Sequence, residues 1–199
     1  MGEVHLDLDP FPALAAWRHL DARDGYEVLT VHDRPGGLVL DGHTTAVEDG
    51  EAFAVGYRIE VDERWCTRRA ELRAWWPHGE GTVLIEGDGA GAWAVDGIDR
   101  VDLAGCLDVD LESSACTNAL PLRRLDLAVG AAGSSSAAYV RALDLAVERL
   151  EQDYVRRPDY GDHVVAHYVC PRFDADFDLT YDRNGLILDY PGLAVRAEL

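Results

Sequence analysis

The sequence predicts a mainly β fold of the α+β class, in which a curved antiparallel sheet or open β-barrel carries one long helix packed on it. Three observations lead to this prediction. Runs of alternating apolar and polar residues recur along the chain, turns rich in glycine separate them, and one long segment has helical periodicity. Because strands do not alternate with helices, the pattern disfavours a parallel α/β sheet and favours an open barrel.

The N-terminal half is expected to form an antiparallel meander. Segment 11–21 has apolar residues near helical spacing between prolines, which indicates a short helix or a turn. The predicted strands that follow are 26–31, 37–47, 52–62, 65–76, 81–87 and 92–97. In the third of these, Phe53, Tyr57 and their alternate neighbours form an apolar row, so Arg58 is expected to face the other side of the sheet.

The long helix is predicted over residues 136–152. Tyr139, Leu143 and Val147 belong to an apolar series at i, i+4, i+7, i+8 and i+11. A serine run precedes the segment and offers N-cap hydroxyls, and Pro158 follows it. Strands are expected again at 163–169, 173–181 and 186–190, and Asn184-Gly185 predicts a hairpin turn between the last two.

The composition restricts the classes of partner. The chain has 199 residues with 48% hydrophobic and 28% charged side chains, which fits one globular domain over residues 1–199. Its 37 acidic and 18 basic residues give a net charge of −19, and all the basic residues are arginine. Such a charge disfavours nucleic acid and stable insertion into anionic membranes, so a lipid would have to enter a pocket.

The expected location is the cytoplasm. Residues 1–7 lack the basic and apolar pattern of a secretory signal, and no stretch is long enough to span a bilayer. The four cysteines, Cys66, Cys106, Cys116 and Cys170, have no Cys-x-x-Cys spacing and are interpreted as buried thiols.

The segment 106–130 concentrates the side chains that could carry chemistry. It contains Asp108, Asp110, Asn118 and the pair Arg123-Arg124 within a short stretch. If residues 107–111 form a strand, the two aspartates share one face. In a strand, the paired arginines would point to opposite faces, and one of them would then be free to pair with an aspartate.

This segment resembles the signature of the putative glycolipid-binding family of bacterial proteins. The resemblance rests on Asp108-Val109-Asp110 followed by Thr117-Asn118-Ala119-Leu120-Pro121-Leu122-Arg123-Arg124-Leu125. It extends to Tyr57-Arg58-Ile59, to Trp65 with Thr67-Arg68, and to the terminal run from Gly185 to Gly192. The resemblance implies an open antiparallel barrel, similar to the carriers that shuttle lipoproteins across the periplasm, with a cavity for a glycolipid.

The predicted function is therefore non-catalytic binding or carriage of an amphiphilic small molecule, with no cofactor, no metal and no catalytic residue. Acyl chains need an apolar slot, while sugar hydroxyls need aromatic faces and hydrogen-bonding groups. The candidate ligand-binding residues are Arg58, Trp65, Arg68, Trp75, Asp108, Asp110, Asn118, Arg123, Arg124 and Tyr190.

Three alternatives stay open. An internal Arg–Asp network could hold the barrel together without touching a ligand. The same cavity could serve a hydrolase or isomerase that acts on a small polar metabolite, although the chain has no His-Glu-x-x-His or Gly-x-Ser-x-Gly motif. A purely structural or protein-binding module would have a filled barrel interior and an exposed apolar patch.

Overall fold

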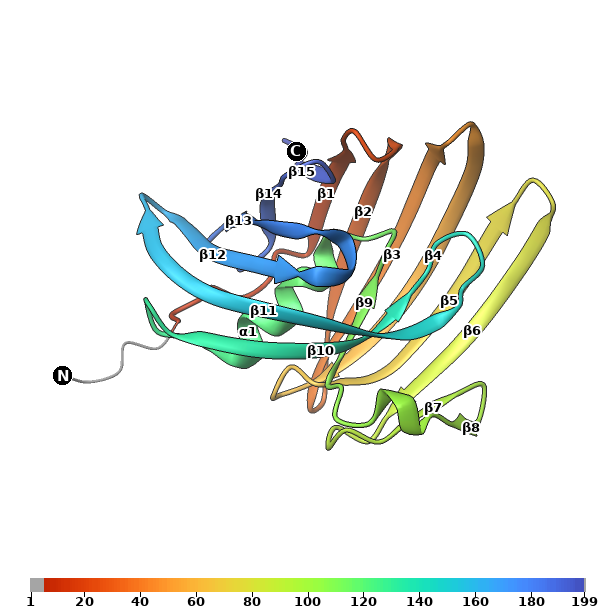
Figure 1. The fold of residues 1–199 in the computed structure, drawn as a ribbon, viewed down its shortest axis with the longest axis horizontal. Coiled ribbons are helices and arrows are strands. Elements are labelled where there is room, and N and C mark those ends of the chain that lie inside the picture. The colour runs from red at the N-terminus through yellow and green to blue at the C-terminus, as the bar shows by residue number, and fades with distance from the viewer. Residues whose placement is uncertain (1–5, 199) are drawn as a thin grey trace.

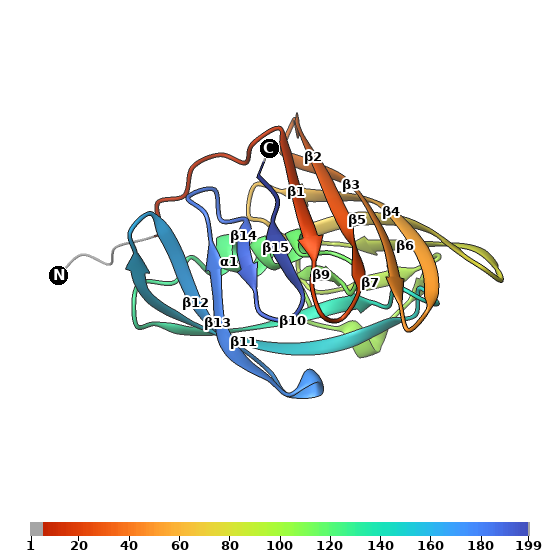
Figure 2. The same ribbon diagram turned by 90° about the horizontal axis from the view of Figure 1, so that it is seen from above.

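A computed structural model describes residues 6–198, and a single 15-stranded sheet runs through this part of the chain (Figures 1 and 2). Its strand order is β8-β7-β6-β5-β4-β3-β2-β1-β15-β14-β13-β12-β11-β10-β9. The strands of the first half are β1 (Leu14–His19), β2 (Asp24–Arg34), β3 (Gly37–Glu48), β4 (Glu51–Asp62), β5 (Thr67–Trp76), β6 (Gly79–Gly87), β7 (Trp93–Val95) and β8 (Ile98–Asp99). Those of the second half are β9 (Asp108–Leu111), β10 (Ala132–Val140), β11 (Val147–Tyr160), β12 (His163–Cys170), β13 (Ala175–Tyr181), β14 (Ile187–Tyr190) and β15 (Ala194–Arg196).

Two antiparallel meanders, β1–β8 and β10–β15, are joined where β15 pairs with β1. The sheet curls until β9, at one edge, lies beside the start of β5, and α1 (Ala119–Leu125) lies inside the curve (Figure 2). There the Thr67 amide donates to the Leu107 carbonyl over 2.9 Å, and the Val109 amide donates to Thr67 Oγ1 over 3.1 Å. β8 and β9 are the two edge strands of the sheet and do not pair with each other, so the barrel is open.

The mainly β fold and its open, curved sheet are as predicted. Strand β4 shows why alternation is a reliable signal here, because Phe53, Tyr57 and Ile59 are buried while Arg58 faces outward. Pro35 and Gly36 form the turn between β2 and β3, and Asn184-Gly185 lies in the turn between β13 and β14. The four cysteines are free and buried, as expected. The expectation about the extreme N-terminus concerns residues 1–5, which lie outside the described residues.

The helix predicted over 136–152 is wrong. The segment instead forms most of the β10–β11 hairpin, and Leu150, Gln152, Tyr154 and Arg156 point inward in turn along β11. Gln152 and Arg156 are polar, so the period-2 pattern of β11 is not visible in the sequence. The apolar residues that match helical spacing lie on two different strands and on the turn between them. Pairing of β10 with β11 overrides the high helix propensity of the alanine, leucine and glutamate residues in this segment.

The serine run before this segment is part of β10 rather than a helix cap. Ser134 Oγ donates to Asp153 Oδ1 over 2.5 Å, and Ser136 Oγ donates to Glu151 Oε2 over 2.6 Å, so both hydroxyls bridge to β11. Pro158 lies where the β11–β12 register shifts, a position at which a strand tolerates a missing amide donor.

The short helix or turn expected over 11–21 is also wrong, because residues Leu14–His19 form β1. Trp17 is fully buried and its Nε1 atom donates to the Ile187 carbonyl over 2.8 Å. Pairing with β2 on one side and β15 on the other fixes the segment as a strand. The helix that does form, α1, has seven residues and buries Leu120 and Leu122 inside the curve.

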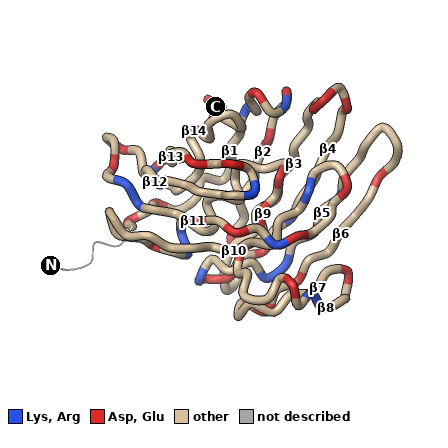
Figure 3. Tube along the Cα trace, viewed as in Figure 1, with Lys and Arg blue, Asp and Glu red and all other residues tan. Residues whose placement is uncertain are grey.

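Within residues 6–198, none of the helices is both long and apolar enough to cross a bilayer. The acidic residues are spread over strands and turns throughout the described chain (Figure 3). Side chains such as Trp17, Leu40, Ile59 and Leu120 fill most of the barrel interior. A ligand would therefore have to occupy a gap in this packing.

Candidate functional site

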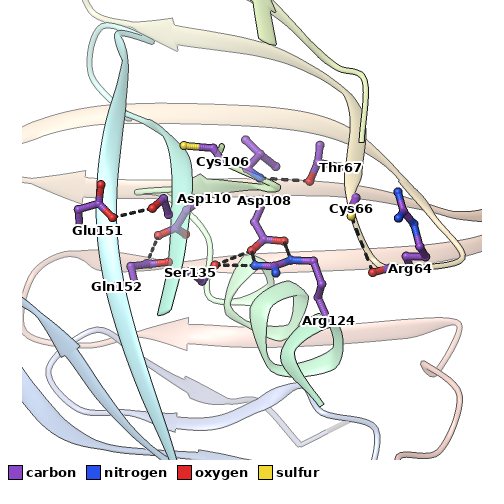
Figure 4. Close-up of polar contacts among 12 residues, drawn as sticks. Arg64, Cys66, Thr67, Cys106, Asp108, Asp110, Arg124, Ser135, Glu151 and Gln152 are labelled. Atoms are coloured by element: carbon purple, nitrogen blue, oxygen red, sulfur yellow. Dashed lines mark hydrogen bonds and ion pairs between the residues drawn. The ribbon is translucent and has the colours of Figure 1, made fainter. Parts of the chain in front are cut away.

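The motif segment runs through the middle of the barrel, and its first charged pair is buried there (Figure 4). Arg124 Nε and Nη2 donate to the two Asp108 carboxylate oxygens over 2.9 and 2.5 Å. Ser135 Oγ adds a bond of 2.6 Å to Asp108 Oδ2 and accepts from Arg124 Nη2 over 2.8 Å. Asp108 is 1% exposed. The predicted internal Arg–Asp network is thus present and ties β9, α1 and β10 together.

Arg123 points away from this network, although the segment forms the helix α1 and not the strand assumed for it. Its guanidinium carbon lies 4.4 Å from the ring centroids of both Phe11 and Trp65. Arg123 Nη2 donates over 2.5 Å to the carbonyls of Asp9 and Asn184. Burial lowers the pKa of Arg123 to about 10. The side chain fastens the segment before β1 and the β13–β14 turn to α1.

An interior pocket of about 270 Å³ lies next to the other half of the motif. Three predicted site residues line it: Asp110 at the end of β9, Asn118 before α1, and Tyr190 at the end of β14. The further polar lining side chains are Arg23, Glu112, Ser114, Tyr139 and Tyr168, and the further aromatic ones are Phe173 and Phe177.

Asp110 is held firmly at the pocket wall. Gln152 Nε2 donates to its Oδ2 atom over 2.8 Å (Figure 4). Thr117 Oγ1 donates to Asp110 Oδ1, also over 2.8 Å. Burial raises the pKa of Asp110 to about 6, while these two hydrogen bonds act in the opposite direction. Glu112, two residues further on, accepts the Ala142 amide over 2.6 Å.

Two buried polar atoms at the pocket lack a hydrogen-bond partner among the described residues. Asn118 is 4% exposed, and its Oδ1 atom accepts no hydrogen bond. Arg23 is 6% exposed, and its Nη1 atom has no acceptor, although its Nε atom lies 3.3 Å from Glu48 Oε2. Buried polar groups in folded proteins are nearly always paired. An unpaired acceptor and an unpaired donor thus belong to residues that line one cavity.

The remaining candidates lie elsewhere. Arg58 pairs with Asp41 over 2.5 Å on the outer face of the sheet, and Trp75, 39% exposed, stacks against Arg73 there. Arg68 is 3.6 Å from Asp62. None of Arg58, Arg68 and Trp75 lines the interior pocket. A role for these three in ligand binding stays a prediction.

Sequence reasoning missed several pocket residues. Tyr168 and Phe177 follow the alternating pattern of β12 and β13, so the sequence predicted these strands. Nothing in that pattern indicated that the two side chains line a cavity. Arg23 follows β1 in a short turn and joins the pocket only because β1 pairs with β15. Phe173 belongs to the 3-10 turn Pro171–Phe173, whose position depends on the curvature of the sheet.

A second buried acid lies just behind the pocket. Glu27 is fully buried and accepts Tyr57 Oη over 2.6 Å, the Ala115 amide over 2.7 Å, and the Ser114 hydroxyl. Burial raises the pKa of this carboxyl, and the hydrogen bonds oppose that shift. These contacts hold the Ser114–Cys116 turn, which forms part of the pocket wall, against β2 and β4.

Replacing Tyr57 with phenylalanine is expected to lower the free energy of unfolding by about 1.5 kcal/mol, because Glu27 loses a buried donor. Urea unfolding of the two proteins measures the difference. An unchanged midpoint and slope would contradict a supporting role for the Tyr57–Glu27 hydrogen bond.

The open, curved sheet with a small interior cavity defines a barrel-like β protein. The chain belongs to the family described as putative glycolipid-binding, which matches residues 14–196. This confirms the resemblance seen in the motif. No functionally curated protein matches the chain.

Two solved structures have a similar fold. A crystal structure of a DUF1089 family protein from Pseudomonas aeruginosa has a TM-score of 0.72 and 28% sequence identity, covering 86% of this chain and 92% of that one. A β-barrel-like protein of the DUF1849 family from Brucella abortus has a TM-score of 0.55 and 12% identity, covering 95% of each chain. The second likeness shows the fold alone.

Proposed function

We propose that this protein binds an amphiphilic small molecule, such as a glycolipid, by its polar head in the interior pocket and does not transform it. The observation that carries the proposal is the pair of unpartnered buried atoms, Asn118 Oδ1 and Arg23 Nη1, in the lining of one cavity. A hydroxyl-rich head offers a donor for the first and an acceptor for the second. The family description supports the same class of ligand.

The size of the pocket indicates which part of the ligand enters. Sites that enclose a whole drug-sized ligand measure about 300–1,000 Å³. The interior pocket, at about 270 Å³, lies just below that range and suits a group the size of one sugar ring. Most of the remaining interior is packed core, so acyl chains would leave the pocket past Phe173, which lines it and is 47% exposed.

Replacing Asn118 with leucine is expected to weaken binding of octyl glucoside at least tenfold, because the isosteric side chain cannot accept a hydroxyl. Isothermal titration calorimetry below the critical micelle concentration measures the affinity. The substitution removes an unpaired buried oxygen, so it should leave the fold at least as stable as before.

Tyr26→Ala is the matched control, since this side chain on β2 is 55% exposed on the outer face and does not line the interior pocket. Its affinity for octyl glucoside should equal that of the unmodified chain. Equal affinity of all three proteins for octyl glucoside would exclude the interior pocket as the binding site. A stronger loss of affinity in the control would favour a binding site on the outer face.

A second candidate function is hydrolysis or isomerisation of a small polar metabolite in the same pocket. It is favoured by the Asp110 carboxyl, whose pKa of about 6 suits a general acid, and by Glu112 in the same lining. Mass spectrometry of a sugar-conjugate mixture incubated with the protein separates the two functions. Products that disappear in Asp110→Asn would favour catalysis, and intact recovery of bound conjugate would favour binding.

The proposed location is the cytoplasm, and the proposed partner is the small molecule rather than nucleic acid. Four buried cysteines without disulfides suit a reducing compartment. The surplus of acidic side chains over the described chain opposes contact with polyanions (Figure 3).

A further inference from the structure

The charged lining of the interior pocket is predominantly negative. Asp110 and Glu112 are carboxylates, and Arg23 is the cation that lines the pocket with them. Glu48 already lies 3.3 Å from Arg23 Nε, so part of this positive charge is compensated from outside the pocket. A ligand that enters therefore meets more negative than positive charge.

The polar contacts that are still available suit neutral hydroxyls. Asn118 Oδ1 can only accept, and the carboxylate oxygens of Glu112 can accept a further hydroxyl beside the Ala142 amide. Arg23 Nη1 can donate to a hydroxyl or ring oxygen. Hydroxyls both donate and accept, so a single sugar ring can satisfy all of these groups without bringing a charge.

An aromatic wall stands beside these polar groups. The rings of Tyr168, Phe177 and Tyr190 pack against one another with centroid separations of 5.9, 6.1 and 5.6 Å. Such a wall can cover the C–H face of a sugar ring, and it provides no positive charge for an anionic substituent.

We propose that the interior pocket selects an uncharged, hydroxyl-rich ring and rejects the same ring when it carries a carboxylate or phosphate. This inference rests on the proposed function and names its ligand class. Selectivity arises because an anionic substituent would face Asp110 and Glu112 at close range while its own hydration is lost. Arg23 contributes as a hydrogen-bond donor to neutral oxygen, with Glu48 compensating its charge.

Octyl β-glucoside and octyl β-glucuronide test the proposal, because they share the ring and the chain and differ at C6, where the first has a hydroxymethyl group and the second a carboxylate. Calorimetric titration of the full chain near neutral pH is expected to give at least tenfold tighter binding of the glucoside. In Glu112→Gln the difference should shrink at least threefold, because one of the opposing charges is removed.

Glu71→Gln is the control, since it removes a carboxylate from the outer face and should leave the selectivity unchanged. Circular dichroism and urea unfolding verify that each variant is folded, and Asp110→Asn takes the place of Glu112→Gln if the latter does not fold. Equal or tighter binding of the glucuronide would overturn the selectivity while supporting the proposed binding function. Binding of neither compound would overturn the proposed function itself.

Discussion

Replacing Arg124 with methionine is expected to lower the free energy of unfolding by about 3–5 kcal/mol. Asp108 is almost completely buried, and Arg124 supplies two of its hydrogen bonds and its counterion. Without the guanidinium, a carboxylate would remain in the barrel interior with only Ser135 as a side-chain donor. The cost arises from this uncompensated charge rather than from the lost contacts alone.

Urea unfolding at neutral pH measures the loss, and two further variants define its origin. Arg73→Gln breaks an exposed pair with Glu80 and should cost less than about 1 kcal/mol. The double variant Arg124→Met with Asp108→Leu removes both charges and should recover most of the stability. A double variant as unstable as the single one would show that packing, and not charge, dominates at this position.

This network explains part of the family resemblance in physical terms. Asp108 and Arg124 were candidates both for ligand contact and for an internal network, and the structure places them in the network. Asp110, on the same face of the same strand, reaches the interior pocket instead. The motif thus serves two purposes, since one aspartate holds α1 to the sheet and the next is presented to the cavity.

The sequence predicted the strands that have one face in the core and the other in solvent. Strands β3 to β6 are of this kind, and their alternation is regular. Strand β11 departs from it because Gln152 and Arg156 face inward, where Gln152 bonds to Asp110 and Tyr168. A polar residue that faces inward breaks the hydrophobic period, and Gln152 does so beside Asp110, so the prediction failed close to the candidate site.

The site itself was predictable only where its residues belong to the segments that resemble the family, which contain Asp110, Asn118 and Tyr190. Asp110 and Asn118 are eight positions apart on one segment, and both line the pocket. Arg23 is brought to them by the pairing of β1 with β15, which is a long-range contact that local spacing does not specify. The turn that contains Arg23 has no recognisable motif, and only the structure shows that the Nη1 atom of Arg23 is unpaired.

The contribution of Asp110 to the stability of the protein is expected to fall as pH rises from about 4 to about 6. Its pKa is about 6 in the folded chain against 3.8 for an unperturbed aspartate, so between these values the folded state binds more protons than the unfolded state. Stability contributed by the protonated carboxyl is present below this interval and is lost as pH rises through it. The substitution Asp110→Asn removes this titrating carboxyl and, with it, this part of the pH dependence of stability.

Urea unfolding of both proteins at about pH 4 and about pH 7.5 tests this linkage. The unfolding free energy of the unmodified chain should decrease relative to that of Asp110→Asn by about 2 kcal/mol between the two conditions. Other titrating groups are common to both proteins and cancel in the comparison. A constant difference, or one of opposite sign, would mean that the hydrogen bonds from Thr117 and Gln152 outweigh burial. The expected sign means that the fold maintains an ionised carboxylate at the pocket wall at a cost in stability.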